Sequence, residues 1–107
     1  MKHTVYIVSD AEEDLFDIYC YVALNDSPLM AERLIGKIKE VCLSLEGFPD
    51  RGHVPPELAP IDVYDYLEVH YKPFRVVYQV VGKGVFVHCV LDGRRDMQEL
   101  LQRRLLR

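Results

Sequence analysis

In the first half of the chain, apolar residues first alternate with a period of two and then recur at helical spacing. Residues 3–9 alternate between two sides and are rich in β-branched side chains, which predicts a first strand. Apolar residues then recur at helical spacing up to Asn25-Asp26, and Ser9 or Asp10 is expected to cap this helix. Ser27-Pro28 begins a second helix, with a capping hydroxyl followed by proline at the first helical position. The short connection predicts an antiparallel αα-hairpin.

The second half of the chain alternates with a period of two. Residues 46–60 hold four of the six prolines and two glycines, which predicts an irregular crossing on the surface. Three strands are predicted after it, at Val63–Tyr71, Phe74–Val81 and Val85–Leu91. Because only short turns join these strands, we expect an antiparallel meander.

A short helix is predicted to close the chain. Asp96 and Glu99 form a capping box, and the residues after them have one apolar stripe. The expected fold is therefore α+β, in the order β-α-α-β-β-β-α, with an antiparallel sheet packed on the αα-hairpin. A length of 107 residues fits a single domain, residues 1–107, with one core.

The period of two gives each strand of the predicted meander two faces. We expect the helical hairpin to cover an apolar face made of Leu67, Val69, Tyr71, Val76, Tyr78, Val80, Val85, Val87, Cys89 and Leu91. The opposite face is polar and aromatic, and its members are Tyr66, Glu68, His70, Arg75, Gln79, Phe86 and His88. That composition predicts a partly open surface that a partner could cover.

Charge and composition narrow the choice of partners. The net charge is −4, and residues 1–93 carry eight basic and fifteen acidic side chains, whereas residues 94–107 carry five and two. An acidic body argues against nucleic acid as the main partner, because phosphate binding favours a basic surface. No apolar run is long enough to cross a bilayer, so we expect a cytoplasmic protein without a membrane partner. The cysteines are expected to be reduced core residues: Cys20, Cys42 and Cys89.

Motifs for cofactors and metals are missing from the sequence. It contains no phosphate-binding loop and no glycine-rich dinucleotide motif, so no cofactor is expected. His70 and His88 could lie on neighbouring strands, but no third ligand has a useful spacing, and we expect no metal. The acidic residues of the first helix are interpreted as a solvated face near its N-terminus: Glu12, Glu13, Asp14 and Asp17.

Three arginines and a histidine are the more informative group. Arg75 and His88 are predicted to share one face of adjacent strands, and Arg94 and Arg95 follow the last strand, so their side chains could converge on a phosphate. Two other interpretations stay open. Arg94 and Arg95 could pair with neighbouring aspartates, or they could meet an acidic protein partner.

The order of the elements and several segments resemble the ParE/RelE toxin superfamily over the whole chain. The segments are Phe74-Arg75-Val76-Val77-Tyr78-Gln79-Val80, Val90-Leu91-Asp92-Gly93-Arg94-Arg95-Asp96, the helical opening at residues 11–19, the proline-bearing residues 45–52 and the ending at residues 101–105. The resemblance implies a small stable toxin, neutralised in a toxin–antitoxin hetero-oligomer by a less stable antitoxin. It also implies a role in plasmid stabilisation or stress response.

The superfamily has two main functional branches, and the resemblance implies one of them. RelE-like members cut messenger RNA in the ribosome, whereas ParE-like members inhibit DNA gyrase without being enzymes in their own right. Tyr66 and Glu68 stand where typical RelE-like toxins have lysine, and a carboxylate there would repel phosphate. The tail after Arg95 has no tyrosine, histidine or lysine to move a proton.

These departures favour a ParE-like gyrase inhibitor that is not an enzyme. The residues expected to bind the target or the antitoxin are Tyr66, His70, Arg75, His88, Arg94, Arg95, Arg103 and Arg104. One alternative is a ribosome-dependent messenger RNA endoribonuclease, with Arg75 and Arg94 clamping the phosphate and His88 or His70 as the base. A second alternative is a family member that has lost toxicity and persists as a binding module.

Overall fold

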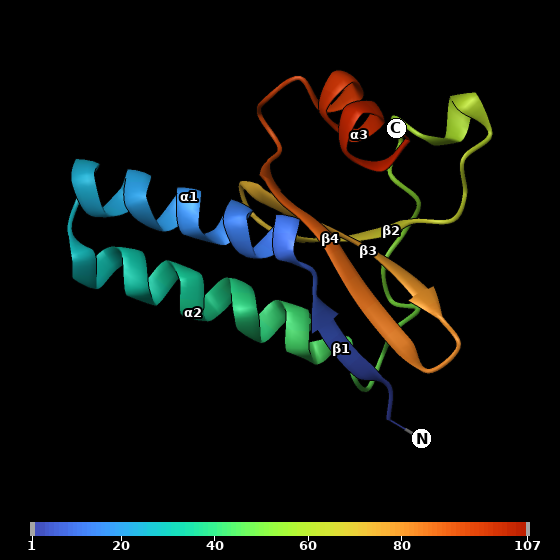
Figure 1. Ribbon diagram of the computed structural model, residues 1–107, viewed down its shortest axis with the longest axis horizontal. Helices are drawn as coiled ribbons and strands as arrows, with labels where there is room; N and C mark the ends of the chain where they lie inside the picture. The colour runs from blue at the N-terminus through green and yellow to red at the C-terminus, as the bar shows by residue number, and fades with distance from the viewer. Residues whose placement is uncertain (1, 107) are drawn as a thin grey trace.

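Three helices and a four-stranded sheet form the described part of the chain in the computed structural model, residues 2–106 (Figure 1). In chain order the elements are β1 (Thr4–Ile7), α1 (Ser9–Asn25), α2 (Pro28–Ser44), a 3-10 turn (Ala59–Ile61), β2 (Leu67–Tyr71), β3 (Phe74–Val81), β4 (Gly84–Asp92) and α3 (Met97–Leu105). The predicted α+β class and the predicted order of elements are confirmed.

The strands lie in the order β1-β4-β3-β2. β2, β3 and β4 form the expected antiparallel meander, and β1 joins its β4 edge as a parallel strand. The αα-hairpin leads the chain away from β1 before the meander begins, which allows this parallel pairing. One consequence concerns the histidines: β3 separates β2 from β4, so His70 and His88 do not lie on neighbouring strands as expected.

Local capping explains where the helices begin. Ser27 caps α2, accepting a hydrogen bond from the backbone N–H of Met30 at 3.1 Å, and Asp96 caps α3 in the same way, as predicted. α1 differs, because Ser9 is already its first residue and Val8 stands at the cap position without a side-chain bond. The expected cap at Ser9 or Asp10 is therefore wrong.

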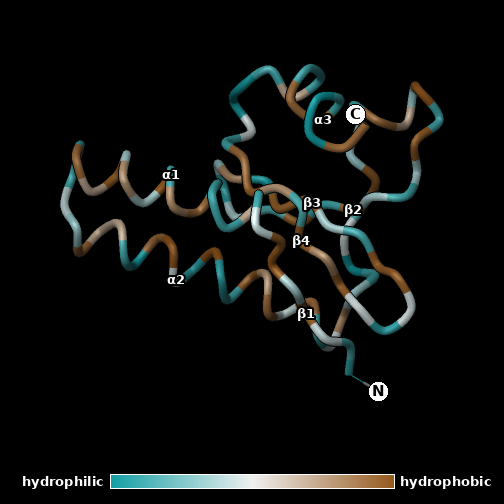
Figure 2. The backbone as a smooth tube through the Cα atoms, viewed as in Figure 1, coloured by the Kyte–Doolittle hydropathy of each residue, from teal (hydrophilic) through white to brown (hydrophobic). Residues whose placement is uncertain are grey.

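A β-bulge in β4 changes which residues face each side of the sheet from what strict alternation predicts. Val77 pairs with Cys89 and Tyr78 pairs with Val87, so His88 is an extra residue in β4 and the alternation shifts by one. As a result Cys89 and Leu91 lie on the α3 side with Val77, and their predicted place under the hairpin is wrong. Apolar positions recur along β4 and along both helices of the hairpin (Figure 2).

Helix α3 and the residues before β2 cover part of the face that was expected to be open. Leu58, Met97, Leu100 and Leu101 form a second buried cluster with the bulged part of the sheet. The predicted strand from Val63 also begins later, at Leu67, because residues 59–63 turn back on themselves and hydrogen bond to residues 58 and 59. The open polar surface is thus smaller than the alternation predicted.

The three cysteines carry free thiols, and Cys42 and Cys89 are fully buried. Burial raises the pKa of Cys42 to about 11 and that of Cys89 to about 12, so both stay protonated and unreactive at neutral pH. Among residues 2–106, no helix has the length and apolar character required to cross a membrane.

Candidate functional site

Arg75 occupies the centre of an ion-pair network on β3. Its Nε donates to Glu68 Oε1 at 2.6 Å, and its two terminal nitrogens donate to both oxygens of Glu57 at 2.9 and 2.6 Å. The side chains are largely buried, with 12% of Arg75 and 1% of Glu68 exposed. All three guanidinium nitrogens therefore donate hydrogen bonds to carboxylates of the same chain.

The ion pairs of this network shift the pKa values of Arg75 and Glu57. Hydrogen bonding to Glu57 raises the pKa of Arg75 above its usual value, although burial acts in the opposite direction. The same hydrogen bonds lower the pKa of the Glu57 carboxyl from 4.5. Neither side chain transfers a proton at neutral pH, because Arg75 stays positively charged and Glu57 stays negatively charged.

Acid should weaken this network in a predictable range. A carboxyl whose pKa is lowered by folding stabilises the folded state fully above its unfolded pKa, 4.5 for Glu57, and the contribution is lost as pH falls through the lower folded value. We expect the free energy of unfolding, measured by urea denaturation, to fall below about pH 4.5. Glu57→Gln should show a smaller decline over the same range, and an equal decline in both proteins would contradict the assignment.

Gly93 allows the chain to pass close over Arg75. A Cβ atom at position 93 would lie 2.8 Å from Arg75 Cδ and 3.1 Å from the carbonyl oxygen of Pro73, to which the Gly93 N–H donates. The structure does not bring Arg94 into the Arg75 network.

Arg94 and Arg95 instead border a groove between α1 and the end of the sheet. Arg94 donates to both carboxylate oxygens of Asp92, which agrees with the local pairing left open above, and 76% of its side chain is exposed. Arg95 is also exposed and has no ion-pair partner among residues 2–106. This α1 groove has a volume of about 520 Å³ and is lined by Asp17, Ile18, Tyr21, Val22, Pro73, Phe74, Asp92, Arg94 and Arg95.

His88 lies apart from these arginines. Its Nε2 is 3.3 Å from Gln79 Oε1, and its ring meets the Tyr66 ring edge to face with centroids 5.7 Å apart. The bulge places His88 opposite Val77 and Tyr78, two to three residues along β3 from Arg75, and its ring contacts Gln79 on the side away from Arg75. Burial and the charge of Arg104 lower the pKa of His88, so the ring is neutral at pH 7.

The two arginines of α3 have different environments. Arg103 pairs with Glu99 on the exposed side of the helix. Arg104 points inward, where it binds both oxygens of Asp14 at 2.9 Å and the carbonyl oxygen of His88 at 3.1 Å. Asp14 also accepts the backbone N–H of Val90. The interpretation of Asp14 as a solvated carboxylate is therefore wrong, because it joins α1, β4 and α3.

Two interacting side chains had no signal in the sequence. Glu57 and His53 lie in the proline-rich crossing, which has no periodic pattern, and only the folded chain places them beside β2 and β3. His70, one of the expected binding residues, is beside them, with its Nε2 3.3 Å from Glu68 Oε2. Tyr66, another of the expected binding residues, is partly buried just before β2.

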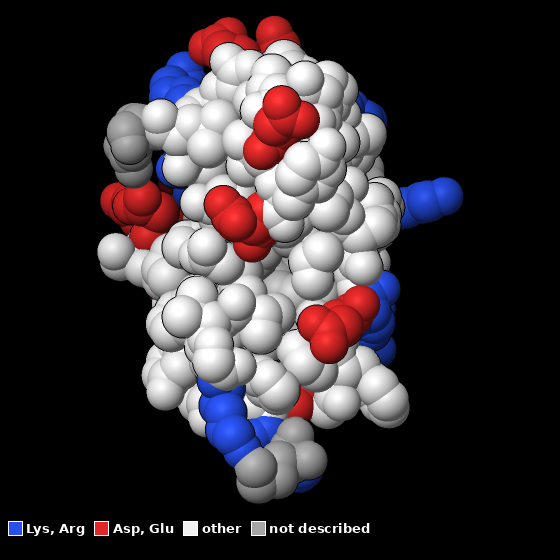
Figure 3. Space-filling model, turned by 90° about the vertical axis from the view of Figure 1, so that its right-hand side faces the viewer, with Lys and Arg blue, Asp and Glu red and all other residues white. Residues whose placement is uncertain are grey.

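The face on the right-hand side of Figure 1 has no continuous basic area. Figure 3 shows acidic side chains spread across it, with basic groups near its margins. This distribution agrees with the acidic body inferred from the sequence. It is unlike the basic surface with which proteins bind nucleic acid.

The fold is that of small toxins from bacterial toxin–antitoxin systems. The chain is similar to one in the chromosomal ParDE toxin–antitoxin system from P. aeruginosa, with a TM-score of 0.70 and 20% identity, covering 83% of this chain and 94% of that one. It is also similar to a chain of the RelBE2 complex from Mycobacterium tuberculosis, with a TM-score of 0.62, 16% identity and coverage of 84% and 96%. A mutant of the E. coli toxin RelE in the free state gives a TM-score of 0.64 at 14% identity, with coverage of 99% and 97%.

Residues 5–97 match the family of ParE toxins from type II toxin–antitoxin systems (parDE), and the chain belongs to this family. The structural likenesses are too low in identity to show more than the fold. No protein with a curated description matches the sequence.

Proposed function

We propose that this protein is the toxin of a type II toxin–antitoxin pair and that it acts by binding DNA gyrase, without cleaving RNA. The observation that carries the proposal is the state of Arg75. A ribonuclease of the RelE-like kind would need this guanidinium to hold a phosphate, but Glu57 and Glu68 occupy it. A phosphate would have to displace two carboxylates and would then face Glu68.

The remaining candidates for nuclease chemistry also stand in unfavourable places. Arg94 is paired with Asp92 at the surface, and the partly buried His88 ring contacts Gln79 and Tyr66. His70, the other candidate base, lies opposite Arg75 on β2, but its Nε2 faces the Glu68 carboxylate at 3.3 Å, where a phosphate would be repelled. Binding a protein target is consistent with this arrangement, since it needs a complementary surface and no proton transfer.

We place the gyrase-binding surface at the α1 groove. It combines aromatic and apolar side chains with exposed guanidinium groups at its rim, and such combinations are typical of the centres of protein–protein interfaces. Tyr21 is 69% exposed, so much of its ring is available for contact. The rim arginines would meet an acidic surface on the target.

The direct experiment measures gyrase supercoiling of a relaxed plasmid with increasing amounts of the purified protein. We expect dose-dependent inhibition, with no cleavage of messenger RNA when the same preparation is added to translating ribosomes. Cleavage of ribosome-bound messenger with gyrase unaffected would replace this proposal with the nuclease. Normal bacterial growth on expression without antitoxin would instead favour a non-toxic binding module.

Removing both rim arginines should weaken the inhibition strongly. For Arg94→Ala/Arg95→Ala we expect the concentration giving half-maximal inhibition to rise by about tenfold or more, since charged groups at an interface accelerate and orient association. Arg33→Ala removes an exposed arginine of α2 outside the groove and is the matched control. Equal inhibition by all three proteins would show that the groove is not the binding surface.

The neutralising partner is proposed to be a cognate antitoxin that binds along the helical hairpin. Large apolar side chains are exposed there, including Phe16, Leu24 and Leu29 at 65%, 85% and 56%. An amphipathic segment could cover them and reach the adjacent groove. Replacing Phe16 and Leu24 with glutamate should abolish co-purification with the product of the neighbouring reading frame, while the folded circular dichroism spectrum is retained.

A further inference from the structure

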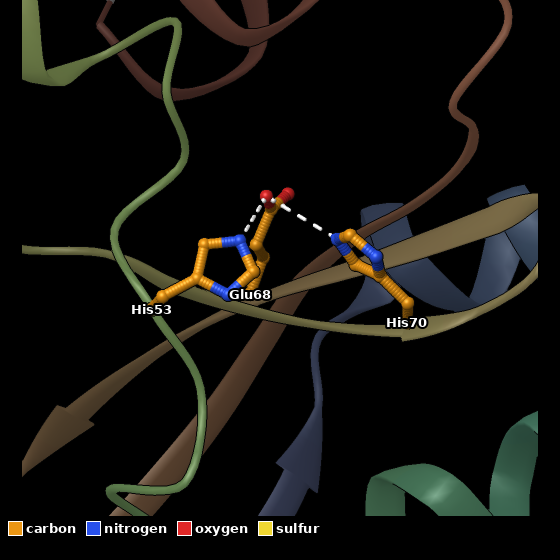
Figure 4. A group of neighbouring side chains, drawn as sticks. All are labelled: His53, Glu68 and His70. Atoms are coloured by element: carbon orange, nitrogen blue, oxygen red, sulfur yellow. Dashed lines mark hydrogen bonds and ion pairs between the residues drawn. The ribbon is translucent and has the colours of Figure 1, made fainter.

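Two histidines and a glutamate meet at the edge of the sheet formed by β2. The backbone positions them: His53 and Glu68 exchange N–H···O=C bonds of 3.1 and 2.8 Å across an isolated antiparallel bridge. His70 follows Glu68 by two residues on the same strand and thus projects from the same face. Figure 4 shows both imidazole rings directed at the Glu68 carboxylate.

The proline-rich crossing is anchored so that His53 keeps this place. Tyr78 donates its hydroxyl hydrogen to the Pro49 carbonyl at 2.7 Å and accepts the Gly52 N–H at 3.1 Å. Gly52 also allows the close approach, because a Cβ there would lie 2.6 Å from the Glu68 carbonyl oxygen. Two independent contacts therefore hold the segment beside β2 immediately before His53.

The three side chains have the spacing of metal ligands. Glu68 Oε2 lies 2.9 Å from His53 Nε2 and 3.3 Å from His70 Nε2, and the three ligand atoms all lie within 4.8 Å of one another. Tetrahedral zinc, with bonds of about 2.0–2.1 Å, separates its ligand atoms by about 3.4 Å. Shifts of a few tenths of an ångström at Glu68 and a rotation of the exposed rings would bring the three atoms onto one ion.

We propose that His53, Glu68 and His70 form a binding site for a divalent transition metal, with zinc as the preferred ion. Two imidazole nitrogens and one carboxylate oxygen are a ligand set that zinc uses in proteins, with water in the fourth position. His53 and His70 are 60% and 41% exposed, so an ion reaches the site from solvent and retains that water.

Arg75 prepares the carboxylate for this role. It binds Oε1 of Glu68 and leaves Oε2 directed toward the two histidines, as outer-sphere partners do when they orient a metal ligand. Glu57 shares the same guanidinium, so one negative charge of the three-residue network stays uncompensated. That charge favours a cation, whereas Arg75 paired with Glu68 alone would oppose one.

The experiment uses untagged protein freed of metal by chelation and then titrated with ZnCl₂ in a calorimeter and with CoCl₂ in a spectrophotometer. We expect one equivalent of zinc to bind with a micromolar or tighter Kd, and cobalt to give the intense visible absorption of a four-coordinate site. Saturation only above about millimolar zinc, or a pale six-coordinate cobalt spectrum, would overturn the proposal whatever the variants do.

Variants separate this site from adventitious binding. His53→Gln and His70→Gln should each weaken zinc binding by roughly 100-fold, since each removes one of three protein ligands. His88→Gln removes a histidine that contacts Gln79 and Tyr66 instead of Glu68, and this variant should bind zinc like the unaltered protein. If the double variant His53→Gln/His70→Gln, folded by circular dichroism, binds zinc unchanged, the assignment is wrong. Because the cobalt spectrum is measured on the unaltered protein, the test stays decisive even if a variant misfolds.

Discussion

Replacing Arg75 with alanine is expected to lower the free energy of unfolding by about 3–5 kcal/mol, because it leaves a buried carboxylate without its partner. Glu68 is 1% exposed and would lose its guanidinium hydrogen bond, while Glu57 would lose two. Chemical denaturation at neutral pH measures the loss. Arg51→Ala, which removes an exposed guanidinium that donates to the Ser44 hydroxyl, should change stability by less than about 0.5 kcal/mol.

A second variant distinguishes a buried unpaired charge from lost packing. Arg75→Leu/Glu68→Leu removes both charges and should recover a large part of the stability lost in Arg75→Ala, as replacement of buried ion pairs by apolar residues does elsewhere. A loss below about 1 kcal/mol in Arg75→Ala would mean that the carboxylates do not hold the guanidinium. With such a small loss, Arg75 would again be a candidate for binding phosphate.

Replacing Asp14 with alanine is expected to cost about 2–4 kcal/mol and to loosen α3 from the sheet. The substitution leaves the backbone N–H of Val90 without an acceptor and Arg104 without its carboxylate, and both groups lie in the interior or close to it. Hydrogen exchange should accelerate first in residues 97–105.

Glu13 provides the matched control for Asp14. It is the adjacent acidic residue of α1, it is exposed, and Glu13→Ala should alter stability by no more than about 0.5 kcal/mol. Equal stability effects of the two substitutions would show that Asp14 is a solvated carboxylate, as the sequence suggested.

Local signals predicted the elements of the fold, because each depends on residues close in sequence. The Ser27-Pro28 start of α2 and the Asp96 cap of α3 follow from side-chain chemistry within three residues. The bulge at His88 had no such signal, since it arises from how β4 pairs with β3, and it reversed the faces of Cys89 and Leu91.

The candidate sites depend on contacts between distant residues, which periodicity does not reveal. Arg75 was expected on the polar face of the meander, but its partner Glu57 lies in a segment without regular structure, which periodicity could not place beside it. The pairing of His53 with Glu68 spans 15 residues and is set by the path of a proline-rich crossing. By contrast, the Arg94–Asp92 pair could be anticipated, because the two residues are only two positions apart.

We propose that the protein arrests cells by occupying gyrase, and direct binding to purified gyrase measured by surface plasmon resonance tests this proposal most sharply. We expect a Kd of about micromolar or below, weakened about tenfold or more by Arg94→Ala/Arg95→Ala and unaffected by Arg33→Ala. Absence of binding, together with cleavage of messenger on the ribosome that Arg75→Ala abolishes in a folded variant, would contradict it.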